Sequence, residues 1–167
     1  MTRAAPRVTV RQARDADEIE RLVPVLLLAE PSERALRWSL DHLSDAVYRA
    51  DLADASPADT PAGAATMRWS GDPCEIVELG VAEALHGRGV GRAIVDWLCD
   101  EARRRGKRAV DVGTANSSIG NLAFYQKCGF RFDHVRRDYF RYHRTPQYEN
   151  GIETRDLVVF RRELTRR

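Results

Sequence analysis

The chain has 167 residues, enough for one substantial hydrophobic core, so a single domain over residues 1–167 is expected. Its composition, 43% hydrophobic and 31% charged, excludes a disordered or membrane-embedded chain. A net charge of +2 excludes the strong positive field of a general nucleic-acid binder, so neither nucleic acid nor a membrane is an expected partner.

The first third of the chain predicts a strand, two helices and a second strand. Residues 8–11 alternate between valine and polar side chains, as in a half-buried strand, and a helix follows them. Pro24 is expected to kink that helix or end it early. A second helix is expected from residues 31–33 onward, with leucines at helical spacing, and a strand over residues 47–53.

A hairpin and two strand–helix units follow. Strands over residues 64–69 and 75–81 are joined by a tight turn. The second is a nearly continuous apolar run, typical of a strand buried on both faces, and it contains Glu78. Further helices are expected from Gly89 to Gly106 and from Ser118 to Gly129, and further strands over residues 109–114, 130–135 and 157–160. This alternation, with antiparallel hairpins at the edges, predicts a mixed α/β fold.

The positions of the cysteines and arginines disfavour three kinds of protein: disulfide-bonded, metal-binding and nucleic-acid-binding. The three cysteines lie far apart and form no CxxC pair, which disfavours a disulfide framework and a metal site. The first residues lack the apolar core of a signal peptide, so a reducing cytoplasm is the expected location. Two arginine-rich clusters, residues 103–108 and 161–167, are interpreted as the charged end of a helix and a solvated tail, with nucleic-acid binding as the less favoured alternative.

A glycine-rich turn joins the strand that ends at Val81 to the next helix. With glycine at 87, 89 and 91, it directs free backbone N–H groups and the positive end of the helix dipole at one point, which predicts an anion site. Gly91 is expected to let the backbone approach a phosphate. The phosphate-loop and dinucleotide patterns both fail because Arg92 stands where they need lysine or glycine.

A second motif lies downstream, where Asn116, Ser117 and Ser118 lead through Asn121 to the run FYQKCGF at residues 124–130. In this order and separation, the two motifs resemble those of the GCN5-related N-acetyltransferase superfamily. That family has a pyrophosphate signature, Arg/Gln-x-x-Gly-x-Gly/Ala, and a later polar cap leading to Tyr-x-Lys-x-Gly-Phe. Here His86 replaces the first residue of the signature.

The resemblance implies an acetyl-CoA-dependent enzyme with a mixed sheet of about seven strands, splayed near the middle, and helices on both faces. It implies that backbone N–H groups of Leu79, Gly80 and Val81 contact the thioester carbonyl. Asn116 and Asn121 would contact the cofactor. The pyrophosphate would lie on the turn formed by His86, Gly87, Arg88, Gly89, Val90, Gly91 and Arg92.

Acetyl transfer to an amine needs a base for the amine proton and an acid for the departing thiolate. The resemblance implies Tyr125 as the acid. Two carboxylates compete for the role of base. Glu78 lies in an apolar strand, where desolvation would raise its pKa, and Asp111 lies in the neighbouring strand. We favour Glu78, with a water molecule carrying the proton, over Asp111.

The segment of residues 137–156, before the last strand, is rich in aromatic side chains. In the family this connection often covers the acceptor site, so Tyr142, Tyr148 and Glu149 are predicted to bind a small cationic amine. A protein N-terminal or lysine acetyltransferase and a non-catalytic acyl-CoA-binding or sensing domain are the alternatives. A homodimer is left open.

Overall fold

The computed structural model describes residues 6–56 and 60–164. Within them, seven strands form one sheet in the order β1-β2-β3-β4-β5-β9-β6, and two short strands pair separately. The strands are β1 (Val8–Gln12), β2 (Ala46–Leu52), β3 (Gly63–Arg68), β4 (Cys74–Val81), β5 (Ala109–Ala115), β6 (Arg131–Arg136), β7 (Tyr148–Glu149), β8 (Ile152–Glu153) and β9 (Leu157–Glu163). The helices are α1 (Ala16–Leu26), α2 (Glu33–His42), α3 (Val90–Arg104) and α4 (Ile119–Lys127), with a 3₁₀ turn at Glu83–Leu85. None of the described helices is long and apolar enough to cross a membrane.

The predicted helices and strands of the sheet are present, with one difference from expectation. Helix α1 contains Pro24, which is exposed, and ends at Leu26. The connection from β6 to β9 contains the β7–β8 hairpin, where a loop was expected. Strands of two residues are too short to show an alternating pattern.

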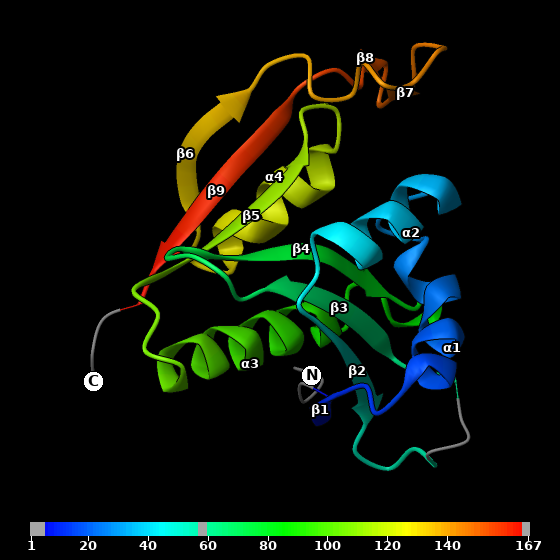
Figure 1. Cartoon of the computed structure of the whole chain (residues 1–167), viewed down its shortest axis with the longest axis vertical. Coiled ribbons are helices and arrows are strands. Elements are labelled where there is room, and N and C mark those ends of the chain that lie inside the picture. The colour runs from blue at the N-terminus through cyan, green and yellow to red at the C-terminus, as the bar shows by residue number, and fades with distance from the viewer. Residues whose placement is uncertain (1–5, 57–59, 165–167) are drawn as a thin grey trace, which may run out of the picture.

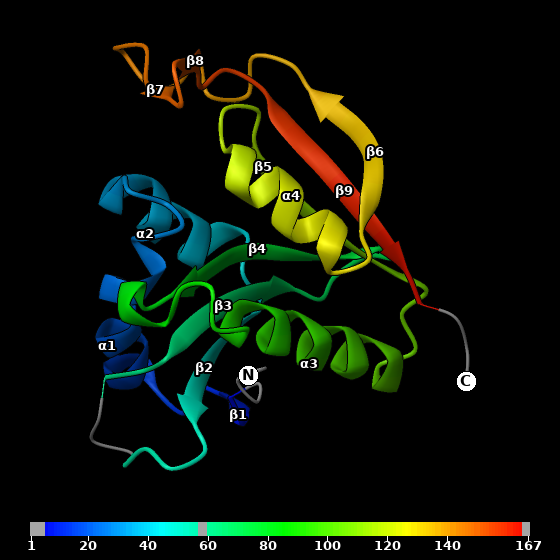
Figure 2. The same ribbon diagram turned by 180° about the vertical axis from the view of Figure 1, so that it is seen from behind.

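Helices cover both faces of the sheet, as predicted. Helices α3 and α4 lie on one face, and α1 and α2 lie on the other (Figures 1 and 2). The larger core lies beneath α3 and α4 and includes Met67, Ile94 and Phe160, which are fully buried. The smaller core lies beneath α1 and α2 and is centred on Leu22 and Leu36.

The strands β4 and β5 are parallel neighbours over only three residue pairs. Residues Cys74 to Ile76 pair with Val110 to Val112, and the pairing ends there. Beyond that point β5 stays paired with β9 to Ala115, whereas β4 stays paired with β3 to Val81, so the two strands diverge (Figure 1). The predicted splay is confirmed. Among the described residues, the edge of β4 that faces β5 pairs with no strand from residue 77 to 81; we call this divergence of the two strands the β4–β5 fork.

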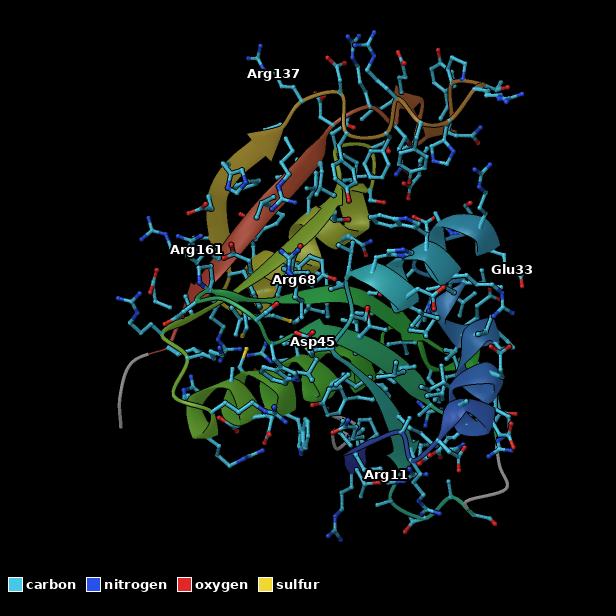
Figure 3. All side chains as sticks on the ribbon, in the orientation of Figure 1. Arg11, Glu33, Asp45, Arg68, Arg137 and Arg161 are labelled. Carbon is cyan, nitrogen blue, oxygen red and sulfur yellow. The ribbon has the colours of Figure 1, made fainter. Side chains whose placement is uncertain are left out.

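Residues 137–156, which connect β6 to β9, are called the insertion. Its first residue, Arg137, lies beyond the sheet edge (Figure 3), and the β7–β8 hairpin lies at the end of the molecule where α2 is found (Figures 1 and 2). The Tyr142 hydroxyl donates to Glu30 Oε2 at 3.4 Å, in the connection between α1 and α2. The insertion therefore reaches from one half of the sheet to the other.

The arginine-rich clusters are held in ion pairs. Arginines near the end of α3 pair with Asp100, Glu101 and Asp72, as a helix-end interpretation predicts. The second cluster differs from expectation, because Arg161 and Arg162 belong to β9 and pair with Asp111 and Asp96 rather than lying in a solvated tail. Arg166 and Arg167 lie outside the described residues.

Candidate active site

A β-bulge in β4 decides which way Glu78 points. Against β3, Ile76 pairs with Met67 and Glu78 pairs with Thr66, so Val77 is an extra residue on β4. A regular strand would place Ile76 and Glu78 on the same face. The bulge instead leaves Ile76 in the core beneath α3 and turns Glu78 toward α2 on the opposite face. The bulge lies where β4 leaves β5.

The Glu78 side chain is only 7% exposed, yet both of its carboxylate oxygens have hydrogen-bond donors. Ser39 Oγ of α2 donates to Oε1, and Thr66 Oγ1 of β3 donates to Oε2. Burial raises the pKa of Glu78, and the two hydroxyl donors oppose this in part. A carboxylate whose pKa is raised toward neutrality is suited to act as a general base.

Asp111, the alternative base, lies in an ion pair near the closed end of the fork. Arg161 of β9 (labelled in Figure 3) faces Asp111 across the β5–β9 pair and donates to both carboxylate oxygens, at 2.8 and 3.0 Å. A bidentate contact of this kind is a strong and geometrically specific ion pair, so both oxygens of Asp111 already have a structural partner. The geometry therefore supports Glu78 more than Asp111 as the base.

The glycine-rich turn has the backbone of an anion site. Gly87 and Gly89 have φ angles of +71° and +86°, a region that favours glycine, and Gly89 caps the start of α3. The first bond of the helix runs from the Ala93 N–H to the Gly89 carbonyl. The amides of residues 90–92 precede it and have no partner within the helix, so they are available to an anion.

The side chain of His86 links this turn to the end of β4 by a hydrogen bond. Its Nε2 lies 2.7 Å from the carbonyl oxygen of Val81. Because a carbonyl oxygen only accepts, this nitrogen carries the proton and donates it. The side chain that begins the turn therefore fixes the backbone around the predicted anion site, and its own contact with a cofactor stays a prediction.

Gly91 lies where α3, α4 and the end of β4 meet. A Cβ atom built on it would lie 3.1 Å from Phe124 Cζ and 3.5 Å from Val81 Cγ2. A side chain here would press on α4, which gives this glycine a packing reason, and the expected approach of a phosphate to its backbone stays a prediction. The glycine is needed because the two helices pack closely, and Arg92 reinforces that contact by donating to the Lys127 carbonyl at 3.1 Å.

Replacing Gly91 with valine is expected to lower the melting temperature, because the new side chain meets Phe124 and Val81 in a packed position. Overpacking costs about 1–3 kcal/mol, which corresponds to a drop of about 3–10 °C for a chain of this size. CoA affinity, measured by calorimetry, should fall as well, because the start of α3 is displaced. Gly120→Ala is the control, since a Cβ there meets no atom within 4 Å. An unchanged melting temperature in Gly91→Val would mean that Phe124 moves aside freely.

Tyr125 is a largely enclosed residue of α4 whose hydroxyl is unengaged. It is 6% exposed, and its ring packs against Phe124, Phe130 and Phe160 at centroid distances of 5.1, 5.9 and 6.1 Å. Burial raises its pKa, and no hydrogen-bond partner of its hydroxyl is found among the described residues. A tyrosine that keeps its proton and has an unoccupied hydroxyl can donate that proton to a ligand.

The two asparagines predicted to contact the cofactor differ in how much of their amide is free. The Asn116 side-chain oxygen accepts the backbone N–H groups of Arg155 and Asp156, each at 3.0 Å, and its NH₂ group donates to the Glu153 carbonyl at 3.0 Å. Asn116 therefore fastens the end of the insertion to β5. Asn121 is exposed and makes one long contact, 3.4 Å to Thr114 Oγ1, so it is better placed to meet a ligand.

Glu149 is bound to the start of α4, and its predicted contact with an acceptor stays a prediction. Ser118 Oγ donates to Glu149 Oε2 at 2.6 Å, and Ser118 makes no capping bond to its own helix. A carboxylate beside a helix N-terminus is stabilised by the helix dipole, so this contact holds the hairpin onto α4. Tyr148 is 68% exposed. Of the three residues predicted to bind the acceptor, Tyr142 is the one that contacts the opposite half of the described structure, through its hydrogen bond to Glu30.

Sequence reasoning missed four residues around Glu78. Ser39 and Thr66 contact its carboxylate, and nothing in the local pattern marks them, because the contacts depend on how α2 and β3 pack on β4. Tyr139 and Glu30 complete the group. Burial raises the pKa of Tyr139, and the carboxylates of Glu75, Glu30 and Glu78 add to this effect, whereas Arg136 opposes it. The aromatic character of the insertion was a signal for Tyr139, although it did not single out that position.

Comparison with known families gives a match that covers most of the candidate site. The model of the Acetyltransferase (GNAT) family matches residues 17–130, which contain the fork, the glycine-rich turn and Tyr125. The Bacillus subtilis (strain 168) protein YvbK, described as an uncharacterized N-acetyltransferase, is 34% identical over 141 residues. That alignment covers 83% of this chain and 86% of YvbK.

Two solved structures share the fold over nearly the whole chain. A Bacillus subtilis acetyltransferase in complex with CoA is 30% identical, with a TM-score of 0.81 over 95% of this chain and 100% of its own. A GNAT family acetyltransferase from Elizabethkingia anophelis with acetyl-CoA bound is 29% identical, with a TM-score of 0.82 over 94% and 98% of the two chains. Both likenesses extend well beyond the two sequence motifs.

Proposed function

Because the chain belongs to the GNAT acetyltransferase family, we propose that it transfers the acetyl group of acetyl-CoA to the primary amine of a small cationic molecule. The general class, an N-acetyltransferase, follows from the family match and from YvbK. When bound, acetyl-CoA supplies an acetyl group activated as a thioester. The proposed course is direct attack by the amine while both substrates are bound.

The observation that carries this proposal is the β4–β5 fork beside the glycine-rich turn. In the fork, alternate N–H and C=O groups of β4 residues 77–81 face no strand in the described part of the chain, so they can pair with an extended polar chain. The stretch contains Leu79, Gly80 and Val81, and it leads to the free amides at the start of α3. CoA has amide groups that could pair with this strand edge and a pyrophosphate that could occupy the anion site. The two similar structures contain CoA and acetyl-CoA.

The proposed base and acid approach the fork from opposite faces of the sheet. Glu78 lies on the face covered by α2, and Tyr125 lies on the face covered by α4. Attack by an amine and departure of a thiolate take place on different sides of the acetyl group. Glu78 would therefore take the amine proton, through a water molecule, and the Tyr125 hydroxyl would return a proton to the leaving sulfur.

The acceptor class is proposed from the groups that surround Glu78. Glu30 lies in the connection between the first two helices, and its Oε2 accepts the hydroxyl of Tyr142, which comes from the insertion. The phenol of Tyr139, from the same segment, lies within electrostatic reach of Glu30, Glu75 and Glu78. Carboxylates combined with exposed aromatic rings favour a cation. A second ammonium group on the acceptor would meet Glu30 while its reacting amine meets Glu78.

A screen of amine acceptors tests the proposal. Acetyl-CoA would be mixed with 1,5-diaminopentane, pentylamine, lysine and an alanine-initiated peptide, and turnover read as released thiol. We expect the diamine to react faster than pentylamine, because the two differ only in the second cation. A preference for the peptide would favour a protein N-terminal acetyltransferase. CoA binding without turnover on any amine would favour a non-catalytic acyl-CoA-binding domain.

Replacing Glu30 with glutamine is expected to raise the KM for the diamine about tenfold, because one charge-assisted contact of about 1.4 kcal/mol is lost. The KM for pentylamine and the affinity for CoA should stay unchanged. Glu149→Gln is the matched control and should leave the diamine KM within about twofold, since Glu149 contacts Ser118. If Glu149→Gln raises the KM more than Glu30→Gln does, then Glu149 of the β7–β8 hairpin, and not Glu30, is the carboxylate that binds the acceptor.

A further inference from the structure

The carboxylate of Glu78 is held by two hydroxyls that come from different parts of the fold. We propose that Ser39 of α2 and Thr66 of β3 are positioning residues that keep this buried carboxylate oriented and ionised for proton transfer. The proposal rests on the proposed function, in which Glu78 is the base. On this proposal, the contact of Ser39 in α2 with Glu78 in β4 serves catalysis as well as packing.

The geometry leaves the carboxylate one orientation. Ser39 binds Oε1 and Thr66 binds Oε2, and the two donors stand on separate elements on either side of the carboxylate. All three side chains are buried, with exposures of 6% for Ser39, 0% for Thr66 and 7% for Glu78. Rotating the carboxylate away would leave two buried hydroxyls without acceptors, which costs about 1–3 kcal/mol for each.

The direction of the Thr66 hydroxyl is determined by a second bond. Its Oγ1 accepts the backbone N–H of Glu78 at 3.0 Å, so a lone pair of Thr66 faces that amide. A hydroxyl has a single proton, and the Thr66 proton is therefore directed at Oε2. This arrangement needs an acceptor at Oε2, which an ionised carboxylate supplies. Thr66 thus favours the charged form that a base must have.

The surroundings of Glu78 otherwise oppose ionisation. Burial raises its pKa most, and the carboxylates of Glu30 and Glu75 raise it further, whereas the bonds from Ser39 and Thr66 lower it. From the insertion, the phenol of Tyr139 is neutral at ordinary pH because its own pKa is raised. The two hydroxyls are therefore the groups that oppose this rise in the pKa of Glu78 and favour its ionised form.

Several charged or titratable side chains on the neighbouring elements are bonded to groups other than Glu78. They are Arg68 of β3 with Glu75, Arg161 of β9 with Asp111, Arg37 of α2 with Glu20 and Glu33, and His42 of α2 with the Trp38 carbonyl. Hydroxyl donors thus take the place that a cation would have beside an ionised carboxylate.

A titration of Glu78 without any acceptor tests the proposal. Protein labelled with ¹³C at glutamate carboxyl carbons would be titrated by NMR, and the Glu78 signal assigned from its loss in Glu78→Gln. Ser39→Ala and Thr66→Val should each raise the Glu78 pKa by about one unit, a tenfold change in proton affinity. Thr66→Ser keeps the hydroxyl and should restore the original value. Ser44→Ala should cause no shift, because Ser44 Oγ is buried and has no hydrogen-bond partner in the part of the chain that the structure describes.

The same variants give a kinetic readout with acetyl-CoA and 1,5-diaminopentane. In Ser39→Ala, the acidic limb of kcat/KM should move to higher pH, with a loss that approaches about tenfold below the wild-type pKa of Glu78 and disappears well above it. An unchanged Glu78 titration in folded Ser39→Ala and Thr66→Val would overturn the positioning role. Near-normal turnover of Glu78→Gln would instead overturn Glu78 as the base, whatever the titration shows.

Discussion

Replacing Glu78 with glutamine is expected to lower kcat/KM about 10²–10³-fold at neutral pH, the effect of removing one general base. Glutamine has nearly the same shape, and its amide can use the same partners. The amide oxygen would accept the Thr66 hydroxyl, and the NH₂ group would face Ser39, whose hydroxyl can rotate to accept it. The measured loss would therefore report the missing charge rather than a rearranged site.

The pH dependence gives this substitution a distinctive signature. A base works when it is deprotonated, so wild-type kcat/KM should fall as the pH drops through the raised pKa of Glu78. Glu78→Gln lacks this ionisation, and its rate should partly recover at high pH, where more of the acceptor amine is already deprotonated. Steady-state kinetics from pH 6 to 10 would show the defect shrinking as the pH rises.

The free energy of unfolding should decrease over the pH range in which kcat/KM increases. Because the folded-state pKa of Glu78 lies above its ordinary value, the folded protein releases this proton later than the unfolded chain does. The free energy of unfolding therefore decreases as the pH rises from the ordinary value through the raised one. Removing the charge should leave the melting temperature of Glu78→Gln at neutral pH equal to or above that of the wild type, which separates lost catalysis from lost folding.

Asp111→Asn is the control for the choice of base. It removes the bidentate contact with Arg161, so it should lower the melting temperature while leaving the acidic limb of the rate profile in place. Thermal unfolding and the pH profile would be compared with those of Glu78→Gln. A large rate defect in Asp111→Asn beside a nearly normal Glu78→Gln would reverse the assignment.

The general architecture could be predicted because local patterns and the fold agree. The apolar run of β4, the helical spacing in α3, and Gly106 after α3 are properties of short segments, and they depend little on what packs against them. The glycine-rich turn also follows from local chemistry, because its positive φ angles favour glycine whatever the surroundings. These features indicate both the fold and the position of the anion site.

The orientation of the site could not be predicted in the same way. The bulge at Val77 exists only in the register between β3 and β4, and without it Glu78 would point to the other face. Likewise, Ser39 and Glu78 are separated by 39 positions in the sequence. Asn116 is separated by 37 to 40 positions from the residues of the insertion that it contacts. Such pairings are set by tertiary packing, and composition or periodicity contains no signal for them.

Replacing Tyr125 with phenylalanine is expected to lower kcat about 10²–10³-fold, the effect of one lost general acid. The ring and its packing against Phe124, Phe130 and Phe160 are retained, so only the hydroxyl is removed. Since that hydroxyl has no partner among the described residues, its loss should leave the free energy of unfolding nearly unchanged. CoA affinity, measured by calorimetry, should change little.

Tyr48→Phe removes the same atom from another buried tyrosine and is the matched control. Its hydroxyl accepts the Trp69 indole N–H at 3.1 Å, so this variant should lose about 1 kcal/mol of stability while keeping its turnover rate. Because burial raises the pKa of Tyr125, the acid keeps its proton throughout the neutral and moderately alkaline range, and wild-type kcat should show no loss there from its ionisation. If Tyr125→Phe turns over within a few-fold of the wild type, Tyr125 is a packing residue, and the leaving sulfur obtains its proton from water.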